Sequence, residues 1–151
     1  MGNLGCGCPS SMAKVIERPV NNESNNVKAV SELRQWPVQL HLVPPTAPYF
    51  KDAEILVSAD CVAFAMGSMH QDLLKGKALA IACPKLDDTA PYVEKLATIF
   101  RTNDTPRVTV AIMEVPCCKG LDIMVKEAIQ KSGRDIPLET VIIGIDGERR
   151  N

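Results

Sequence analysis

The sequence has few aromatic residues, no excess of charge of either sign and no long apolar run. Aromatic side chains make up 4% of its 151 residues, so Val, Ile, Leu and Ala must build the core, as they do around buried parallel strands. Lys and Arg total 17 against 18 Asp and Glu, a formal net charge of −1 that lacks the basic field of nucleic-acid-binding proteins. No run approaches the roughly 18 apolar residues of a membrane span. We therefore expect neither nucleic acid nor a membrane as a partner.

The sequence also lacks the short motifs of several large enzyme classes. The patterns G-x-G-x-x-G, G-x-x-x-x-G-K-[ST] and G-x-S-x-G are absent, which argues against a nicotinamide-dependent enzyme, a nucleoside triphosphatase and a serine hydrolase. The N-terminus has neither the basic nor the apolar segment of an export signal. We therefore expect a cytoplasmic protein, and whether it is an enzyme stays open.

What is present is an alternation of short apolar segments and amphipathic helices. Apolar or β-branched segments of strand length predict five strands, over 38–43, 54–60, 77–82, 107–114 and 140–145. Apolar spacing predicts helices over 93–100 and 121–129, the second ending at Gly133, and a short helix over 27–35 that Pro37 ends. This alternation predicts a three-layer α/β/α sandwich, flavodoxin-like or Rossmann-like, with about five mainly parallel strands.

The first 26 residues differ in composition from the rest of the chain. They are rich in Gly, Ser, Asn and Pro, and such a stretch cannot bury an apolar face. We therefore predict a flexible N-terminal arm over 1–26, which carries Cys6 and Cys8, followed by a single α/β domain over 27–151.

Six cysteines are the anomaly of the composition, because thiols in a chain without an export signal are more often metal-binding or catalytic than disulfide-bonded. Four of them stand at or just past the ends of predicted strands: Cys61, Cys83, Cys117 and Cys118. The carboxyl ends of parallel strands share one edge of the sheet, and ligands bind there. We therefore expect these four thiols to converge, with Cys6 and Cys8 of the arm folding across the same edge.

Several thiols at one edge are typical of a metal centre. Zinc and iron–sulfur clusters both select Cys ligands, and a cluster takes about four. A structural zinc site usually shows two compact C-x-x-C pairs, so the scattered layout here favours a cluster. Two alternatives stay open: a non-catalytic zinc-bearing interaction module, and a thiol or persulfide enzyme whose nucleophile, Cys117 or Cys118, is activated by a helix from about Lys119. Taken alone, Cys83 also fits a buried thiol that only packs in the core.

Other polar residues near the cysteines have more ordinary interpretations. His70 fits a metal ligand, a proton donor or a surface histidine, and the surface interpretation is preferred. Asp87 and Asp88 are interpreted as helix-capping residues, with a functional role for Lys85 or Asp87 as the alternative. Asp60 and Glu114 are expected beside the cysteines, where they would tune a cluster through hydrogen bonds.

Six ordered motifs span nearly the whole chain. They are Gly7-Cys8-Pro9; Trp36-Pro37-Val38-Gln39-Leu40 with Val43-Pro44-Pro45-Thr46-Ala47-Pro48; Ala59-Asp60-Cys61-Val62; Cys83-Pro84-Lys85-Leu86-Asp87-Asp88; Met113-Glu114-Val115-Pro116-Cys117-Cys118; and Ile143-Gly144-Ile145-Asp146-Gly147-Glu148. This series resembles a group of 4Fe-4S cluster-binding proteins of anaerobic bacteria and archaea, in which an α/β segment like this one usually follows a ferredoxin module. The resemblance implies a [4Fe-4S] cofactor. The ferredoxin runs C-x-x-C-x-x-C-x-x-x-C are absent here, so the electrons would come from a separate redox partner such as a ferredoxin.

The residues and the resemblance together predict an iron–sulfur redox protein. The expected cluster ligands are Cys61, Cys83 and Cys117, with Cys8 or Cys118 as the fourth and Cys6 spare. An exposed cluster edge suits a redox partner or a symmetric dimer equally well, so a homo-oligomer is left open.

Overall fold

The computed structural model describes residues 12–19 and 28–151. Within these residues the fold is built on a four-stranded sheet in which every neighbouring pair of strands is parallel. Its strands are β1 (Ile55–Ala59), β2 (Ala78–Ala82), β3 (Val108–Met113) and β4 (Leu138–Ile143). Their spatial order is β2-β1-β3-β4. The predicted parallel α/β architecture is confirmed, with four strands instead of five.

Strands β1 and β3 form the centre of the sheet because they are apolar on both faces. Every residue of either strand is buried, as expected of strands covered on both sides. Val57 of β1 pairs with Ala80 of β2 and with Val110 of β3. This register aligns the carboxyl ends of the three strands and so sets where the loops that follow them begin.

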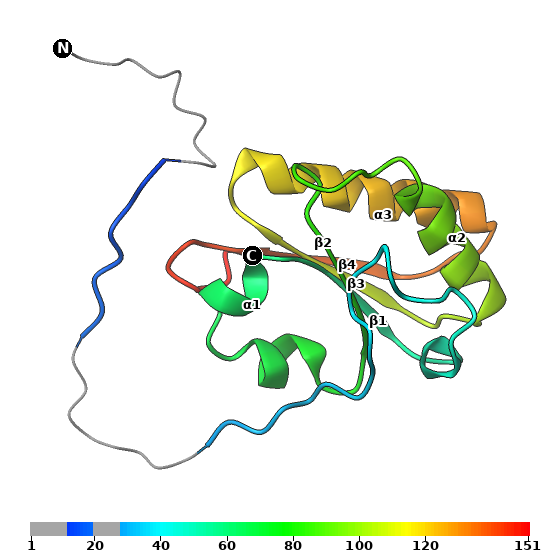
Figure 1. The fold of residues 1–151 in the computed structure, drawn as a ribbon, viewed down its shortest axis with the longest axis horizontal. Coiled ribbons are helices and arrows are strands. Elements are labelled where there is room, and N and C mark those ends of the chain that lie inside the picture. Colours follow the sequence, from blue (N-terminus) through cyan, green and yellow to red (C-terminus); the bar gives the residue numbers. More distant parts are fainter. Residues whose placement is uncertain (1–11, 20–27) are drawn as a thin grey trace.

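Helices cover both faces of the sheet (Figure 1). Two longer helices lie side by side over one face, and two short helical elements lie over the other. The two longer helices are α2 (Tyr92–Thr102) and α3 (Lys119–Ser132). The two short elements on the other face are α1 (Val62–Ala65) and the π-helical turn η3 (His70–Leu74). Helix α2 buries Leu96 and Phe100, which its apolar spacing placed on one face. Helix α3 ends at Gly133, whose φ of 72° is the left-handed conformation that glycine favours there.

The predicted strand over 38–43 is wrong, because this segment makes only an isolated bridge to the sheet. Gln39 lies opposite Ile81 of β2, where the Ile81 N–H donates to the Val38 carbonyl at 2.8 Å and the Leu40 N–H donates to the Ile81 carbonyl at 2.9 Å. The chain then turns, with the Leu42 and Val43 N–H groups both donating to the Gln39 carbonyl, at 2.8 and 3.0 Å. Two prolines follow at once, and proline has no N–H with which to continue a ladder.

The predicted helix over 27–35 is also wrong, because residues 28–35 run along the sheet edge without helical structure. The Gln35 side chain takes the place of a strand there. Its Oε1 accepts the Leu79 N–H at 2.7 Å and its Nε2 donates to the Leu79 carbonyl at 2.8 Å. This pairing satisfies backbone groups of the edge strand β2, which helix formation would leave bare.

The opposite edge of the sheet, at β4, is covered by the C-terminal residues. Arg149 forms an antiparallel bridge with Ile143, and the Arg150 N–H donates to the Ile142 carbonyl at 2.8 Å. The Asn151 amide donates to the Thr140 carbonyl at 2.7 Å. In both outer strands, backbone groups therefore form hydrogen bonds with residues outside the sheet.

The predicted N-terminal arm over 1–26 falls mostly outside the described residues, and so do Cys6 and Cys8. The part that is described, 12–19, forms neither helix nor strand. The division into an arm and a single domain stays a prediction. In the described ranges, no helix combines the length and the apolarity needed to cross a bilayer.

Candidate functional site: a thiol-lined cavity

The connections of the sheet reverse direction between β1 and β3. From β1 the chain crosses to β2 on one side, and from β3 it crosses to β4 on the other. In doubly wound sheets this reversal opens a crevice at the carboxyl ends of the two central strands, where ligands bind. These ends lie toward the left of Figure 1, beside α1 and the start of α3.

Four cysteines lie in the loops at this edge. Cys61 directly precedes α1, and Cys83 directly follows β2. Cys117 and Cys118 belong to the 3-10 turn η4 (Pro116–Cys118), which Pro116 opens and which leads into α3. All four are free cysteines. Cys61 and Cys118 stand at the N-cap positions of α1 and α3 without capping them through the side chain.

The four cysteines line one cavity of about 180 Å³. The other described residues that line it are apolar apart from the ionisable Asp60: Ala59, Asp60, Pro84, Met113, Val115 and Ile145. Cys61 is exposed, Cys83 and Cys117 are half-buried, and Cys118 is buried with 6% of its surface exposed. Thiols from three separate loops therefore line the same cavity, and they differ in how deeply each is buried.

The thiols influence one another electrostatically. Burial raises the pKa of Cys61, and the charges of Cys83, Asp60 and Cys117 raise it further. Burial raises the pKa of Cys118 to about 11 against the opposing effect of a hydrogen bond to the Met113 backbone, and Cys117 and Cys61 raise it further. Several negative charges in one apolar space repel each other, whereas a positively charged centre among them would favour the thiolates.

The Cys83 loop is held by Asp87. The Asp87 carboxylate accepts the Cys83 N–H at 3.0 Å, and the Asp87 N–H donates back to the Cys83 carbonyl at 2.9 Å. The interpretation of Asp87 as a helix cap is therefore wrong. Asp88 accepts the Ala90 N–H at 3.3 Å and thus forms the turn before α2, which begins only at Tyr92.

Asp60 and Glu114, both expected beside the cysteines, have different surroundings. Asp60 lines the cavity, and its buried Oδ1 has no hydrogen-bond partner within residues 12–19 and 28–151. Burial raises the pKa of Asp60, as does the charge of Asp87. Glu114 lies outside the cavity and forms an ion pair with Arg150 at 2.9 Å. Of these two carboxylates, Asp60 is the one that lines the cavity.

His70 lies away from the thiol-lined cavity. Its Nδ1 accepts the Glu32 N–H at 3.0 Å and so anchors residues 28–35 to η3. This role is structural.

Within the ranges that the structure describes, the four cysteines of the cavity are the residues that could hold a metal centre at this edge. Among the described residues, no three His, Cys, Asp or Glu side chains surround a point where one ion would bind. In an iron–sulfur cluster each cysteine binds a different iron, so the sulfurs stand farther apart than around one ion. Four thiols around an apolar cavity are the type of ligand set that such clusters use.

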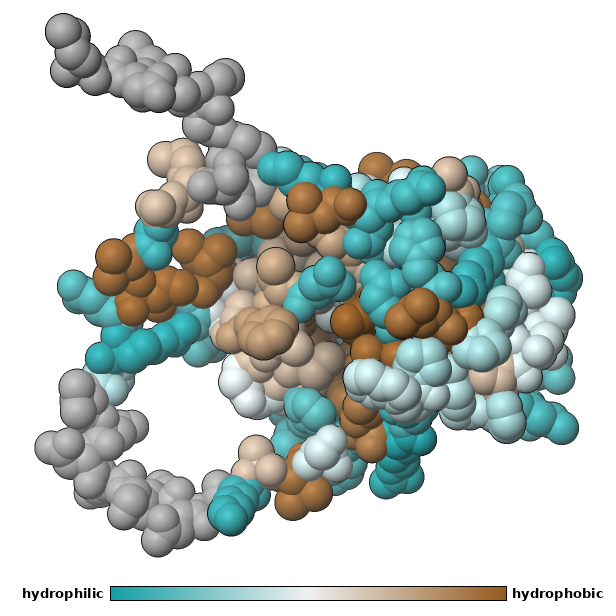
Figure 2. All heavy atoms as spheres, viewed as in Figure 1, coloured by the Kyte–Doolittle hydropathy of each residue, from teal (hydrophilic) through white to brown (hydrophobic). Residues whose placement is uncertain are grey.

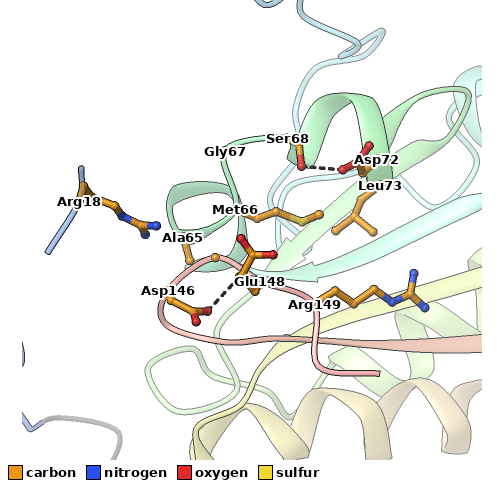
Figure 3. Close-up of a pocket in the computed structure, with 11 residues that line it drawn as sticks. Arg18, Ala65, Met66, Gly67, Ser68, Asp72, Leu73, Asp146, Glu148 and Arg149 are labelled. Atoms are coloured by element: carbon orange, nitrogen blue, oxygen red, sulfur yellow. Dashed lines mark hydrogen bonds between the residues drawn. The ribbon is translucent and has the colours of Figure 1, made fainter. Parts of the chain in front are cut away.

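A larger cavity, of about 560 Å³, lies on another side of α1 (Figure 3). It lies between the loop from α1 to η3 and the turn over 146–149, with Arg18 beside it. Its polar groups largely satisfy one another: Ser68 donates to Asp72 at 2.6 Å, and the Glu148 N–H donates to Asp146 at 3.0 Å. The cysteines that the structure describes line the smaller cavity instead, which is therefore the candidate site.

Sequence reasoning missed the partnership of Asp87 with Cys83. The signal for it is a carboxylate four residues after a strand-end cysteine, separated from it by Pro84, which favours a tight turn.

A doubly wound parallel sheet with its crevice at the β1/β3 reversal is the Rossmann type of α/β fold. The chain belongs to the Rossmann-like domain family, which it matches over residues 47–150. It is also 34% identical over 118 residues to an uncharacterized protein of Archaeoglobus fulgidus, covering 78% of this chain and 83% of that protein. No solved structure matches the chain. The family match includes all four cysteines of the cavity.

Proposed function

We propose that the protein binds one iron–sulfur cluster, [4Fe-4S], in the thiol-lined cavity and exchanges electrons with a partner protein. The observation that carries this proposal is that four free thiols from three loops line one cavity of about 180 Å³ at the sheet reversal. Cys61, Cys83 and Cys117 are the proposed ligands because they line the cavity at its more open positions. The fourth ligand is Cys118 or Cys8.

The electrostatics of the cavity support a positively charged occupant. Without one, Cys61 and Cys118 resist ionisation, because each is desolvated and lies near other groups that become negative. The irons of a cluster would compensate these charges and hold the cysteines as thiolates, since a metal deprotonates its thiol ligands.

The structure bears on both alternative functions. A nucleophilic cysteine needs a lowered pKa, so the thiol-enzyme alternative does not fit Cys118, whose pKa is raised to about 11 despite its place at the N-terminus of α3. That alternative therefore falls to Cys117. A zinc module needs ligands around a single ion, and the described residues offer no such group.

The surroundings of the cavity suit a protein partner. Phe64 of α1 is 93% exposed and Leu86 in the Cys83 loop is 84% exposed. Figure 2 shows apolar side chains over α1, beside a mostly hydrophilic surface over α2. Exposed apolar side chains next to a redox centre favour docking, since apolar patches mark interaction sites. The resemblance to cluster-binding proteins suggests a ferredoxin as this partner.

The proposal is tested by metal and sulfide analysis of protein purified or reconstituted without oxygen. We expect iron together with acid-labile sulfide, and a visible absorption band that Cys61→Ser, Cys83→Ser and Cys117→Ser each remove. Cys6→Ser is the matched control and keeps the band. Loss of the cluster in Cys118→Ser or in Cys8→Ser identifies the fourth ligand.

Two results would overturn the proposal. One is a cluster that stays fully bound in both Cys61→Ser and Cys83→Ser. The other is protein that contains zinc, or no metal and a reactive thiol, which would favour one of the alternatives.

A further inference from the structure

Three hydrogen-bond donors converge on one oxygen next to the cavity. The Asp87 Oδ2 accepts the Cys83 N–H at 3.0 Å and the Gln39 side-chain amide at 3.1 Å, and it also accepts the Tyr92 hydroxyl. The donors come from three places: the cysteine loop itself, the turn beside the edge of β2, and the first residue of α2. A carboxylate with three donors is far more tightly held than an ordinary surface aspartate.

The same residue closes the loop from its backbone. Its N–H donates to the Cys83 carbonyl at 2.9 Å, so both backbone groups of Cys83 are bonded to Asp87. The loop between them has few remaining ways to move, and Pro84 within it restricts the backbone further. The position of the Cys83 side chain at the cavity therefore depends on Asp87.

The charge of Asp87 also reaches the cavity. The Asp87 carboxylate accepts the N–H of Cys83, which lines the cavity, so its charge stands one hydrogen bond away from a cavity residue. A fixed negative charge beside a redox centre favours its oxidised, more positive state.

We infer that Asp87 is the positioning residue of the site: it holds the Cys83 loop at the cavity, and its carboxylate lowers the reduction potential of the group bound there. Tyr92 and Gln39 hold Asp87 in turn. The part that concerns potential rests on the proposed cluster, whereas the part that concerns Cys83 does not. The two parts therefore need separate measurements.

The first measurement uses metal-free protein and the rate at which a thiol reagent modifies Cys83, followed by mass spectrometry of the peptide. In Asp87→Ala we expect modification about tenfold faster, the change that follows from losing one charge-assisted hydrogen bond. Tyr92→Phe removes one of the three donors and gives a smaller increase. Cys61 in the same sample is the internal control and keeps its rate.

Asp88→Ala is the matched control variant, because it removes an equal charge one residue away that has no hydrogen bond to Cys83. We expect it to leave the Cys83 rate unchanged. An unchanged Cys83 rate in both Asp87→Ala and Tyr92→Phe overturns the positioning role. Equal acceleration of Cys83 and Cys61 also overturns it, because that result indicates general loosening. If Asp87→Ala does not fold, Tyr92→Phe decides the question by the same criteria.

The second measurement uses the cluster-loaded protein and its reduction potential. Asp87→Asn keeps an acceptor oxygen for the three donors and removes the charge, so we expect bound cluster with a more positive potential. An unchanged potential in Asp87→Asn overturns the electrostatic role. A wild-type protein that binds no cluster overturns the proposed function and the electrostatic role together, and the Cys83 rate still decides the positioning role.

Discussion

The slow reaction of Cys118 is the sharpest prediction from the cavity. At pH 8 a thiol with the ordinary pKa of 9.0 is ionised to about one part in ten, whereas a thiol with a pKa of about 11 is ionised to about one part in a thousand. A thiolate of higher pKa is the better nucleophile, by about six- to tenfold for this difference. The net expectation is that Cys118 reacts with a disulfide reagent about tenfold more slowly in the folded chain, and burial slows it further.

The assay compares metal-free folded protein with the same protein unfolded in urea, both at pH 8. An aromatic disulfide reagent is added, and the modified Cys118 peptide is followed by mass spectrometry. Cys117→Ser is a useful second sample, because it removes a neighbouring charge and a thiol hydrogen bond that raise the Cys118 pKa. Cys118 then reacts faster than in the wild type. Equal or faster reaction of Cys118 in the folded wild type would refute the reasoning and favour Cys118 as a nucleophile.

Two further predictions concern stability, measured by urea unfolding of the metal-free protein. Gly147→Ala lowers the free energy of unfolding by at least about 1 kcal/mol, since Gly147 has a φ of 92° and a Cβ there would collide with the α1 backbone. Gly67→Ala is the control, because Gly67 has open space around it. Equal stability of the two variants would contradict this expectation. Leu121→Ala removes a fully buried side chain of α3 and costs about 2–5 kcal/mol; a loss below about 1 kcal/mol would show that the helix is less tightly packed than described.

The central part of the fold was predictable because its signals are local. The strands around Val57 and Val110 are short, apolar and β-branched, and the helix before Gly133 has both apolar spacing and a glycine stop. The errors lie at the edge of the sheet, where long-range pairing decides the outcome. The Gln35 side chain carries no periodic signal, yet its bonds to Leu79 of β2 replace the predicted helix. The predicted strand ends early because the chain turns at Gln39.

The candidate site was predictable in position more than in detail. The cysteines stand next to strand ends in the sequence, and parallel strands bring such ends to one edge. The contact of Asp87 with Tyr92 and Gln39 was not predictable, because the three residues meet only when the Cys83 loop, α2 and the turn after residue 38 are folded together. Which cysteines bind a cluster stays a prediction.

The covered edges of the sheet limit how this molecule associates with others. An open outer strand is a template to which another polypeptide adds by backbone pairing, the route of strand exchange and of fibril growth. Here the Gln35 side-chain amide already forms hydrogen bonds with backbone groups of β2, and the C-terminal residues do the same at β4. Contact with another molecule is thereby directed to helices and loops, and beside the thiols helix α1 and the loop after Cys83 each expose an apolar side chain, Phe64 and Leu86.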